Sequence, residues 1–190
     1  EIALAVPNPI AQLENNVNDL RKDQLLGNIY LEIGLFKNVK FRNEFGGSFG
    51  YNKNSLFQRA FSYGEISFDN PTLRKTNENS DYWILKNLLT YSNTFGEKHD
   101  LTVLLGHESQ ESAYNGIVTT GAGFVDNNNP TLNNANADTF IIDEYKGSNA
   151  LESYFSRLIY SFDKRYGITA SLRADGSSRL AEGNKWQYFP

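Results

Sequence analysis

The stretch "LLGNIYLEIGLFKNVKFRNEFGGSFGY", residues 25–51, consists of two segments in which apolar and polar residues alternate. A period of two residues places successive side chains on opposite sides of an extended chain, which is typical of a β-strand with two different faces. The short link Phe36-Lys37-Asn38 between the segments predicts a hairpin. The apolar positions are Leu25, Ile29, Leu31, Ile33, Leu35, Val39, Phe41, Phe45, Phe49 and Tyr51.

Two later parts of the chain repeat this pattern, so hairpins are expected at about residues 22–51, 81–114 and 151–175. Residues that face each other across an antiparallel pair must point to the same side of the sheet, so their parity tests the proposed turns. All three turns keep the apolar positions together. The matching pairs are Leu35 with Val39, Phe95 with Leu101, and Phe162 with Tyr166 or Ile168.

The connections between the hairpins are expected to be long loops, at about residues 52–80 and 115–150, which are rich in Asn, Gly, Ser and Thr. Compact soluble domains seldom contain unstructured connections of this length. Short turns at one end of the strands and long loops at the other are typical of an outer-membrane barrel, whose long loops are extracellular.

The predicted fold class is therefore all-β, an antiparallel up-and-down transmembrane β-barrel. The chain carries about six strands and, at Trp186 to Phe189, the start of a seventh. Bacterial single-chain barrels have at least eight strands. A single partial barrel domain is therefore expected over residues 1–190, as a fragment of a longer protein.

Composition excludes several classes of function. The chain has no Cys, which rules out disulfides, thiolate metal sites and a cysteine nucleophile within it. The net charge is −4 and no stripe of Lys and Arg is present, so nucleic acid is not an expected partner. Aromatic residues make up 14% of the chain although the mean hydropathy is −0.51, a combination that suits strands with one apolar face.

The segment "ITASLRADGSSRL" at 168–180, followed by "NKWQYFP" at 184–190, resembles part of the SusC/RagA-type TonB-dependent outer-membrane transporters. In that family a strand ending in Arg-x-Asp-Gly-Ser-Ser-Arg is followed by Asn-Lys-Trp-x-x-Phe-Pro. Four other segments resemble the same family in the same order. They are "NPIAQLEN" at 8–15, "GNIYLEIGLFKNVKFRNEFG" at 27–46, "LTYSNTFGEKHDLTVLLGHESQ" at 89–110 and "LESYFSRLIYSFDKRYGITASLR" at 151–173.

This resemblance implies a bacterial outer-membrane barrel of 22 strands that encloses an amino-terminal plug. It further implies import of large nutrients, oligosaccharides or peptides, with a SusD-like surface lipoprotein as lid and the TonB complex as the source of energy. Outer-membrane lipid would surround the barrel. The present chain would be a portion from the middle of the barrel, without the plug domain.

The expected interior of the barrel carries six charged residues that could touch plug or substrate, or could simply brace a polar interior. No catalytic, cofactor-binding or metal-binding residue is expected, and the protein is not expected to be an enzyme. The lumen-facing candidates are Arg42, Glu44, Lys86, Glu108, Arg173 and Asp175.

The two histidines are expected to be solvated or interfacial, with His99 in a turn and His107 on the lipid side near a strand end. "DNNNP" at 126–130 offers oxygen ligands to calcium together with acidic neighbours, but lacks the spacing of a calcium loop. A plain Asn-rich surface loop is the competing interpretation. Those neighbours are Asp138, Asp143 and Glu144.

Two other groups of residues have both a structural and a functional interpretation. The run from Asp175 to Ser178 could form an anion nest, but the turn preferences of Asp and Gly explain it as the entry to a loop. Four aromatic residues of the first long loop could stack on sugar rings or pack against a partner lipoprotein. These are Phe57, Phe61, Tyr63 and Phe68.

One alternative from a different class is a soluble extracellular β-sandwich for carbohydrate binding or adhesion, in which the Asn-rich loops form the binding face. Such sandwiches also alternate in sequence. They differ because one face of each sheet packs on a second sheet, and because their strands are shorter.

Overall fold

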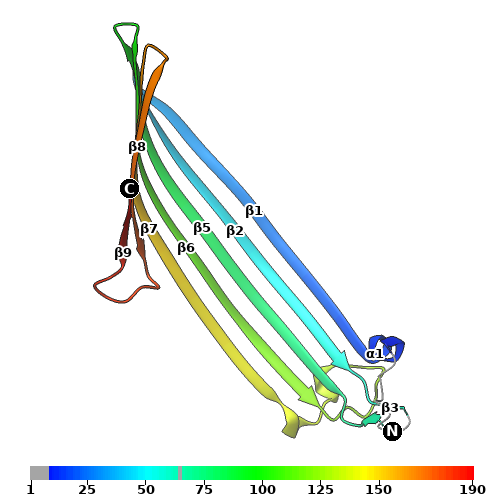
Figure 1. The fold of residues 1–190 in the computed structure, drawn as a ribbon. Helices are drawn as coiled ribbons and strands as arrows, with labels where there is room; N and C mark the ends of the chain where they lie inside the picture. Colours follow the sequence, from blue (N-terminus) through cyan, green and yellow to red (C-terminus); the bar gives the residue numbers. More distant parts are fainter. Residues whose placement is uncertain (1–8, 64–65) are drawn as a thin grey trace, which may run out of the picture. The chain divides into compact units, whose positions relative to one another are not determined.

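The computed structural model describes residues 9–63 and 66–190 and contains one large β-sheet. Its seven strands lie in the order β1-β2-β5-β6-β7-β8-β9, so each strand pairs with its neighbours along the chain (Figure 1). The predicted all-β, up-and-down antiparallel arrangement is confirmed. The strands are β1 (Asn16–Phe36), β2 (Val39–Gln58), β5 (Thr72–Phe95), β6 (His99–Ala122), β7 (Ile141–Phe162), β8 (Tyr166–Ser177) and β9 (Trp186–Phe189).

Smaller elements occupy the connections. Helix α1 (Pro9–Asn15) precedes β1, and the strands β3 (Phe61–Tyr63) and β4 (Ile66–Phe68) form a separate two-stranded sheet. Two single 3₁₀ turns, η1 (Leu132–Asn134) and η2 (Ala137–Thr139), lie between β6 and β7. No helix among the described residues is long and apolar enough to cross a lipid bilayer.

Tight turns join β1 to β2, β5 to β6 and β7 to β8, as the alternation predicts. The expected pairing of Phe95 with Leu101 is wrong, because β5 ends at Phe95 and β6 already begins at His99. Phe162 pairs with Tyr166, which is one of the two registers expected for the third hairpin. The second turn contains Gly96 and Glu97 with φ angles of 53° and 61°. Both residues are in the left-handed region, which glycine adopts without a Cβ clash and other residues adopt at a modest cost.

The strands are longer than the sequence predicts, so the expected bounds of the long loops are wrong. Residues 52–58, 72–80, 115–122 and 141–150 belong to β2, β5, β6 and β7. These segments are polar, and their apolar alternation is weak. A ladder of backbone hydrogen bonds needs no apolar side chain, so a strand can continue where the hydrophobic pattern ends.

Contacts divide the chain into two compact units. Unit 1 contains Gly50–Asn79, Tyr114–Lys146 and the residues before Leu25, and unit 2 contains the rest. The buried apolar residues of the described chain all lie in unit 1. They are Phe57, Leu73 and Phe124, with Leu132 and Ala135 packed against them.

In unit 2 the sheet has one apolar and one polar face. The apolar face remains exposed in this chain, and its side chains alternate with those of the polar face as strand geometry requires. On β7 and β8 the register brings Leu158 opposite Ala170 and Tyr160 opposite Ile168 on the apolar face. Other exposed members are Leu25, Ile29, Leu31, Ile33, Leu35, Phe45, Phe49, Leu89, Phe95, Leu105 and Leu172.

Candidate functional site

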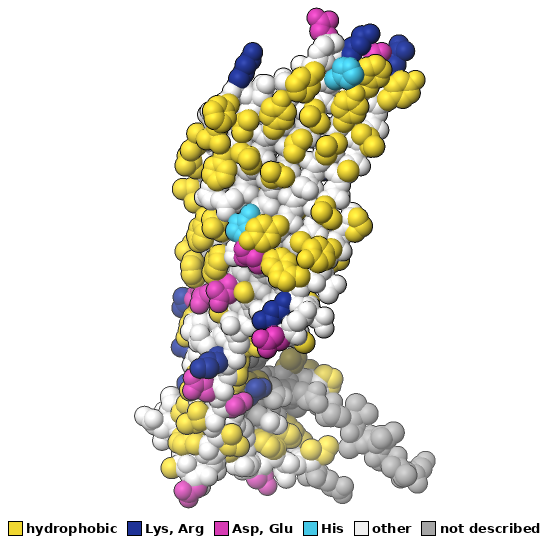
Figure 2. Space-filling model, turned by 90° about the vertical axis from the view of Figure 1, so that its left-hand side faces the viewer, with side chains coloured by type: hydrophobic (Ala, Val, Ile, Leu, Met, Phe, Trp, Pro, Cys, Tyr) yellow, Lys and Arg dark blue, Asp and Glu magenta, His cyan; other side chains and the backbone are white. Residues whose placement is uncertain are grey.

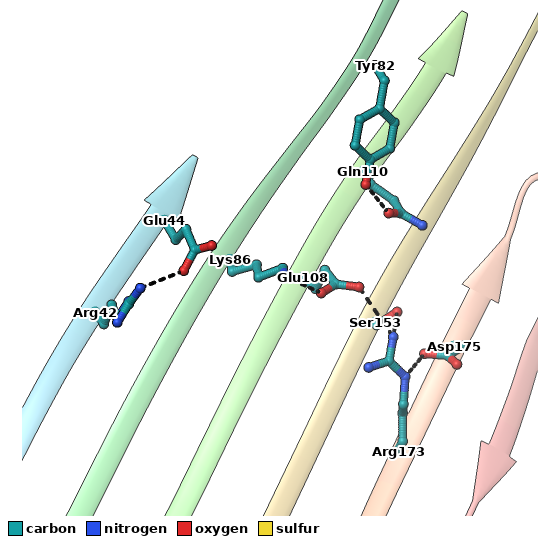
Figure 3. Close-up of polar contacts among 9 residues, drawn as sticks. All are labelled: Arg42, Glu44, Tyr82, Lys86, Glu108, Gln110, Ser153, Arg173 and Asp175. Carbon is teal, nitrogen blue, oxygen red and sulfur yellow. Dashed lines mark hydrogen bonds and ion pairs between the residues drawn. The ribbon is translucent and has the colours of Figure 1, made fainter. Parts of the chain in front are cut away.

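Six charged side chains and one serine on the polar face of unit 2 form a row across five strands, which we call the charged ladder (Figure 3). It begins on β2 and ends on β8. All six residues expected on this face belong to it, and the structure adds Ser153 of β7. Its ionised members are Arg42, Glu44, Lys86, Glu108, Arg173 and Asp175.

Glu108 lies at the centre of the charged ladder and has a cation on each side. The Lys86 Nζ lies 3.7 Å from one carboxylate oxygen, and the Arg173 Nη2 lies 3.4 Å from the other. The Glu108 side chain is only 15% exposed, less than any other member of the ladder that forms an ion pair. Such a carboxylate depends on its partners, because burial penalises an unpaired charge.

Arg173 makes three polar contacts through its guanidinium group. Its Nε donates to Asp175 at 2.6 Å, and its Nη2 donates to Ser153 at 3.0 Å in addition to contacting Glu108. Ser153 is completely buried, and its register partner on β8 is Asp175. The planar guanidinium presents several donors in fixed directions, which suits it to join β6, β7 and β8.

Aromatic rings support both arginines of the charged ladder. Arg42 pairs with Glu44 at 3.0 Å and lies over the Tyr30 ring, 4.1 Å from its centroid. Arg173 lies 5.3 Å from the centroid of the Phe155 ring. Cations over aromatic faces gain an electrostatic attraction without losing the packing of their stems.

Gly106 provides the space in which Phe155 lies. A Cβ at this position of β6 would overlap several carbons of the Phe155 ring. Only glycine can occupy such a close approach without moving the ring. The sequence contains a signal for this contact, an isolated glycine inside a strand, but that signal does not identify the partner.

The charged ladder carries three positive and three negative side chains, and every carboxylate has a cation within 4 Å. Its charges therefore compensate one another. Beside it, the Tyr82 hydroxyl donates to Gln110 at 2.8 Å. Chemically, the ladder can cross-link β5, β6, β7 and β8 and keep this face of the sheet polar.

A second polar cluster lies in unit 1, and the sequence pattern did not predict it. Tyr145 donates to Glu78 at 2.7 Å, and Asn52 donates to the other oxygen of that carboxylate at 3.2 Å. The hydrogen bond to Glu78 raises the pKa of Tyr145 above its ordinary value. The Tyr145 ring lies over Gly116 and 6.2 Å from Tyr114.

The two histidines differ from expectation in their positions along β6. His99 is the first residue of β6 rather than part of the turn, and its Nδ1 lies 2.7 Å from the Tyr160 hydroxyl. His107 lies well inside β6 rather than near a strand end, because β6 continues to Ala122. It forms a hydrogen bond with Glu152, a pairing that no local pattern could reveal.

No three His, Asp or Glu side chains in residues 9–63 and 66–190 are grouped as metal ligands would be. In "DNNNP", the Asp126 carboxylate instead accepts the backbone N–H of Asn128 at 2.8 Å. The possible anion nest lies largely in a strand, since β8 continues to Ser177. Gly176 of that segment lies beneath the Trp186 ring.

Of the four loop aromatics, Phe57 is not available to a ligand. It is 2% exposed and packs edge-on against Phe124 at a centroid distance of 5.3 Å. Phe61 instead stacks between Tyr63 and Phe68 in the small β3–β4 sheet. Side-chain burial by a segment more than 60 residues away cannot be read from the alternation of one strand.

The chain is similar to known proteins in both sequence and structure. No family model matches the chain. The chain is 31% identical over 189 residues to TonB-dependent receptor P39 of Formosa agariphila, an alignment that covers 96% of this chain and 18% of the receptor. It is 27% identical over 186 residues to TonB-dependent receptor SusC of Bacteroides thetaiotaomicron, again covering 96% of this chain and 18% of the relative.

Solved structures agree with this similarity. The RagAB peptide transporter superposes with a TM-score of 0.84 at 24% identity, over 92% of this chain and 20% of that one. The RagAB peptide importer in its open-open state gives a TM-score of 0.84 at 25% identity, over 93% and 19%. The chain thus spans about a fifth of the length of the relatives it matches.

Proposed function

Because the chain is a relative of the TonB-dependent receptors of the SusC and RagA type over nearly its whole length, we propose that it forms part of the wall of an outer-membrane import barrel. The two-faced sheet of unit 2 carries this proposal: its apolar face contacts lipid and its polar face lines the lumen. Six long strands are too few to close a barrel. The sheet therefore closes together with further strands of a longer protein.

The proposed activity is TonB-dependent uptake of large nutrients, either oligosaccharides or peptides, rather than catalysis. The RagAB peptide transporter supports peptides as a cargo class, and oligosaccharides are the other class that the SusC/RagA resemblance implies. The proposed partners are a SusD-like surface lipoprotein and the TonB complex. In this proposal the plug, which contacts TonB, is formed by a part of the protein outside residues 1–190.

The charged ladder is proposed to face the lumen and to brace the wall rather than to select a cargo. Its balanced charges support this role, because a site for a charged substrate would leave charge of the opposite sign uncompensated. Contacts of the same residues with a plug domain are compatible with bracing, since ladder and plug would share the lumen.

The soluble sandwich has no support from the strand arrangement. Such a fold needs a second sheet packed on the first. In residues 9–63 and 66–190, the second sheet consists of β3 and β4 alone, with three residues each. The apolar face of unit 2 remains exposed.

The full-length protein should fractionate with outer membranes, require detergent for extraction and migrate differently on a gel before and after boiling. A deletion strain should lose growth on, or uptake of, one class of oligosaccharide or peptide, and a strain lacking TonB should show the same loss. Recovery of the full-length protein in the soluble fraction without detergent would contradict the membrane proposal. Normal uptake in the deletion strain would contradict the import proposal.

A further inference from the structure

On the apolar face of unit 2, aromatic and histidine side chains gather at two levels along the strands. The first level lies beside the tight turns. His99 of β6 lies 4.9 Å from Phe162 and 6.0 Å from Tyr160 between ring centroids. Rings with one polar group and one apolar body are typical of the boundary between hydrocarbon and water.

The second level combines rings with charges. The His107 ring lies 5.0 Å from Tyr154, whose ring lies 6.0 Å from Trp186. His107 also forms its hydrogen bond with Glu152 here. Of the two tryptophans in the chain, Trp186 belongs to this group, and Trp83 lies on β5.

On β5 and β6, Trp83 and Glu111 also combine an aromatic ring with a carboxylate. Its indole Nε1 donates to Glu111 at 3.3 Å, so its ring packs on the sheet while its polar edge contacts a carboxylate. Asn87 forms a hydrogen bond of 3.2 Å with the Nδ1 atom of His107, the ring nitrogen that does not contact Glu152. The Asn87 side chain also accepts a hydrogen bond of 2.7 Å from Asn43. Polar groups that border a hydrocarbon layer must be paired in this way, because an unpaired group would be costly there.

Between the two levels, the apolar face is almost continuous. Figure 2 shows hydrophobic side chains over the strands between the two histidines, with charged side chains at both ends of this band. On β6 the residues of the band are Leu101, Val103 and Leu105. Neighbouring strands add Leu89, Leu158, Ile168 and Leu172.

The spacing of the two levels matches a membrane. From His99 to His107 the chain advances by eight residues, which corresponds to about 27 Å along an extended strand. With the strand tilt of roughly 35–45° found in such barrels, the separation of His99 and His107 along the membrane normal is about 20 Å. It is about 30 Å if the upper boundary lies at Glu111 instead of His107. These values bracket the apolar band of about 25 Å on outer-membrane barrels.

We propose that the group formed by His107, Glu152, Tyr154, Trp186, Trp83 and Glu111 lies in the lipid headgroup region at the external surface of the membrane. This inference rests on the proposed function. It divides each long strand of unit 2 into a short membrane-crossing part beside the tight turn and a part exposed to water. On β6, residues from His99 to His107 cross, and Ser112 and Ala113 are outside the bilayer.

Spin labels on single cysteines in the full-length protein would test this boundary. Four positions on the apolar face of β6 are suitable: Val103→Cys, Leu105→Cys, Ser109→Cys and Ala113→Cys. The labelled protein is reconstituted into liposomes, and its accessibility to oxygen is compared with its accessibility to a water-soluble nickel chelate. Ser156→Cys and Ser148→Cys on β7 provide an independent strand.

Labels at Val103, Leu105 and Ser156 should contact oxygen more than the nickel chelate, and labels at Ala113 and Ser148 should show the reverse. The ratio of the oxygen accessibility to the nickel accessibility should pass through one close to Ser109. A lipid-like ratio at Ala113 and Ser148, or a water-like ratio at Leu105, would overturn the proposed boundary alone. Water-like ratios at all six positions would instead contradict the membrane location itself, and with it the proposed function.

Discussion

Arg173 is the best connected side chain of the charged ladder, since it makes a polar contact with one residue on each of β6, β7 and β8. If Arg173 is replaced, the loss of stability depends on the carboxylates that then lack a cation. Glu108 would keep only Lys86, and Asp175 would lose the one cation that the described chain places within 4 Å of it. The effect is moderated by water, because the Arg173 side chain is 37% exposed.

We expect Arg173→Ala to destabilise the full-length barrel by about 1–2 kcal/mol. The midpoint temperature for loss of the folded, fast-migrating gel band measures this change. Arg21→Ala is the matched control, because the Arg21–Asp23 pair is 72% and 51% exposed and should contribute almost nothing. Equal midpoints for the two variants would show that the charged ladder does not brace the wall.

A second prediction for a single residue concerns the contact between Gly106 and the Phe155 ring. A methyl group at this position would overlap the Phe155 ring, so Gly106→Ala should cost about 1–3 kcal/mol, measured by the same midpoint. In the background of Phe155→Ala the same substitution should cost much less, because the ring is gone. Gly27→Ala is the control, since a Cβ there would have no atom of the described residues within 4 Å. Additive effects of Gly106→Ala and Phe155→Ala would contradict the contact.

At the scale of the strand, neighbouring residues of β6 lie on opposite faces of the sheet. Leu105 is exposed on the apolar face, whereas Leu104 lies on the face of Glu108 by the alternation of a strand. The sequence predicts this division because alternation is local. It leaves the strand length undetermined, since the polar ends of β5, β6 and β7 are held by backbone pairing.

Leu105→Arg should strongly reduce the amount of folded barrel in the outer membrane, because an arginine on the lipid face costs about 2–4 kcal/mol near the bilayer midplane. Leu104→Arg should be tolerated, since the polar face is hydrated and already carries charges. Quantitative gels of unheated outer-membrane fractions compare the two variants. Similar losses for both would contradict the proposed assignment of the two faces.

For the whole molecule, the proposed function implies that the two ends of the strands lie on opposite sides of the outer membrane. The tight turns should face the periplasm, and the longer connection between β6 and β7 should be extracellular. Because residues 1–190 contain no cysteine, an introduced thiol is unique within them. A parent protein without that thiol controls for labelling elsewhere.

Asn128→Cys, in the β6–β7 connection, should react with a membrane-impermeant maleimide on intact cells. Lys164→Cys, in the turn between β7 and β8, should react only after the outer membrane is permeabilised. Labelling of both before permeabilisation, or of Lys164→Cys alone, would invert or exclude the proposed topology. Both residues are in polar connections, so neither substitution should affect folding.

The sequence by itself determined the class of the fold, the three tight turns and the face on which each of the six ladder residues lies. These properties follow from a two-residue period and from turn chemistry, which act over a few neighbouring residues. Only the tertiary structure decided which charges meet, as with Arg173 and Glu108 or His107 and Glu152. It also buried Phe57 and extended the polar strands, because cross-strand register and packing join residues that lie far apart in the chain.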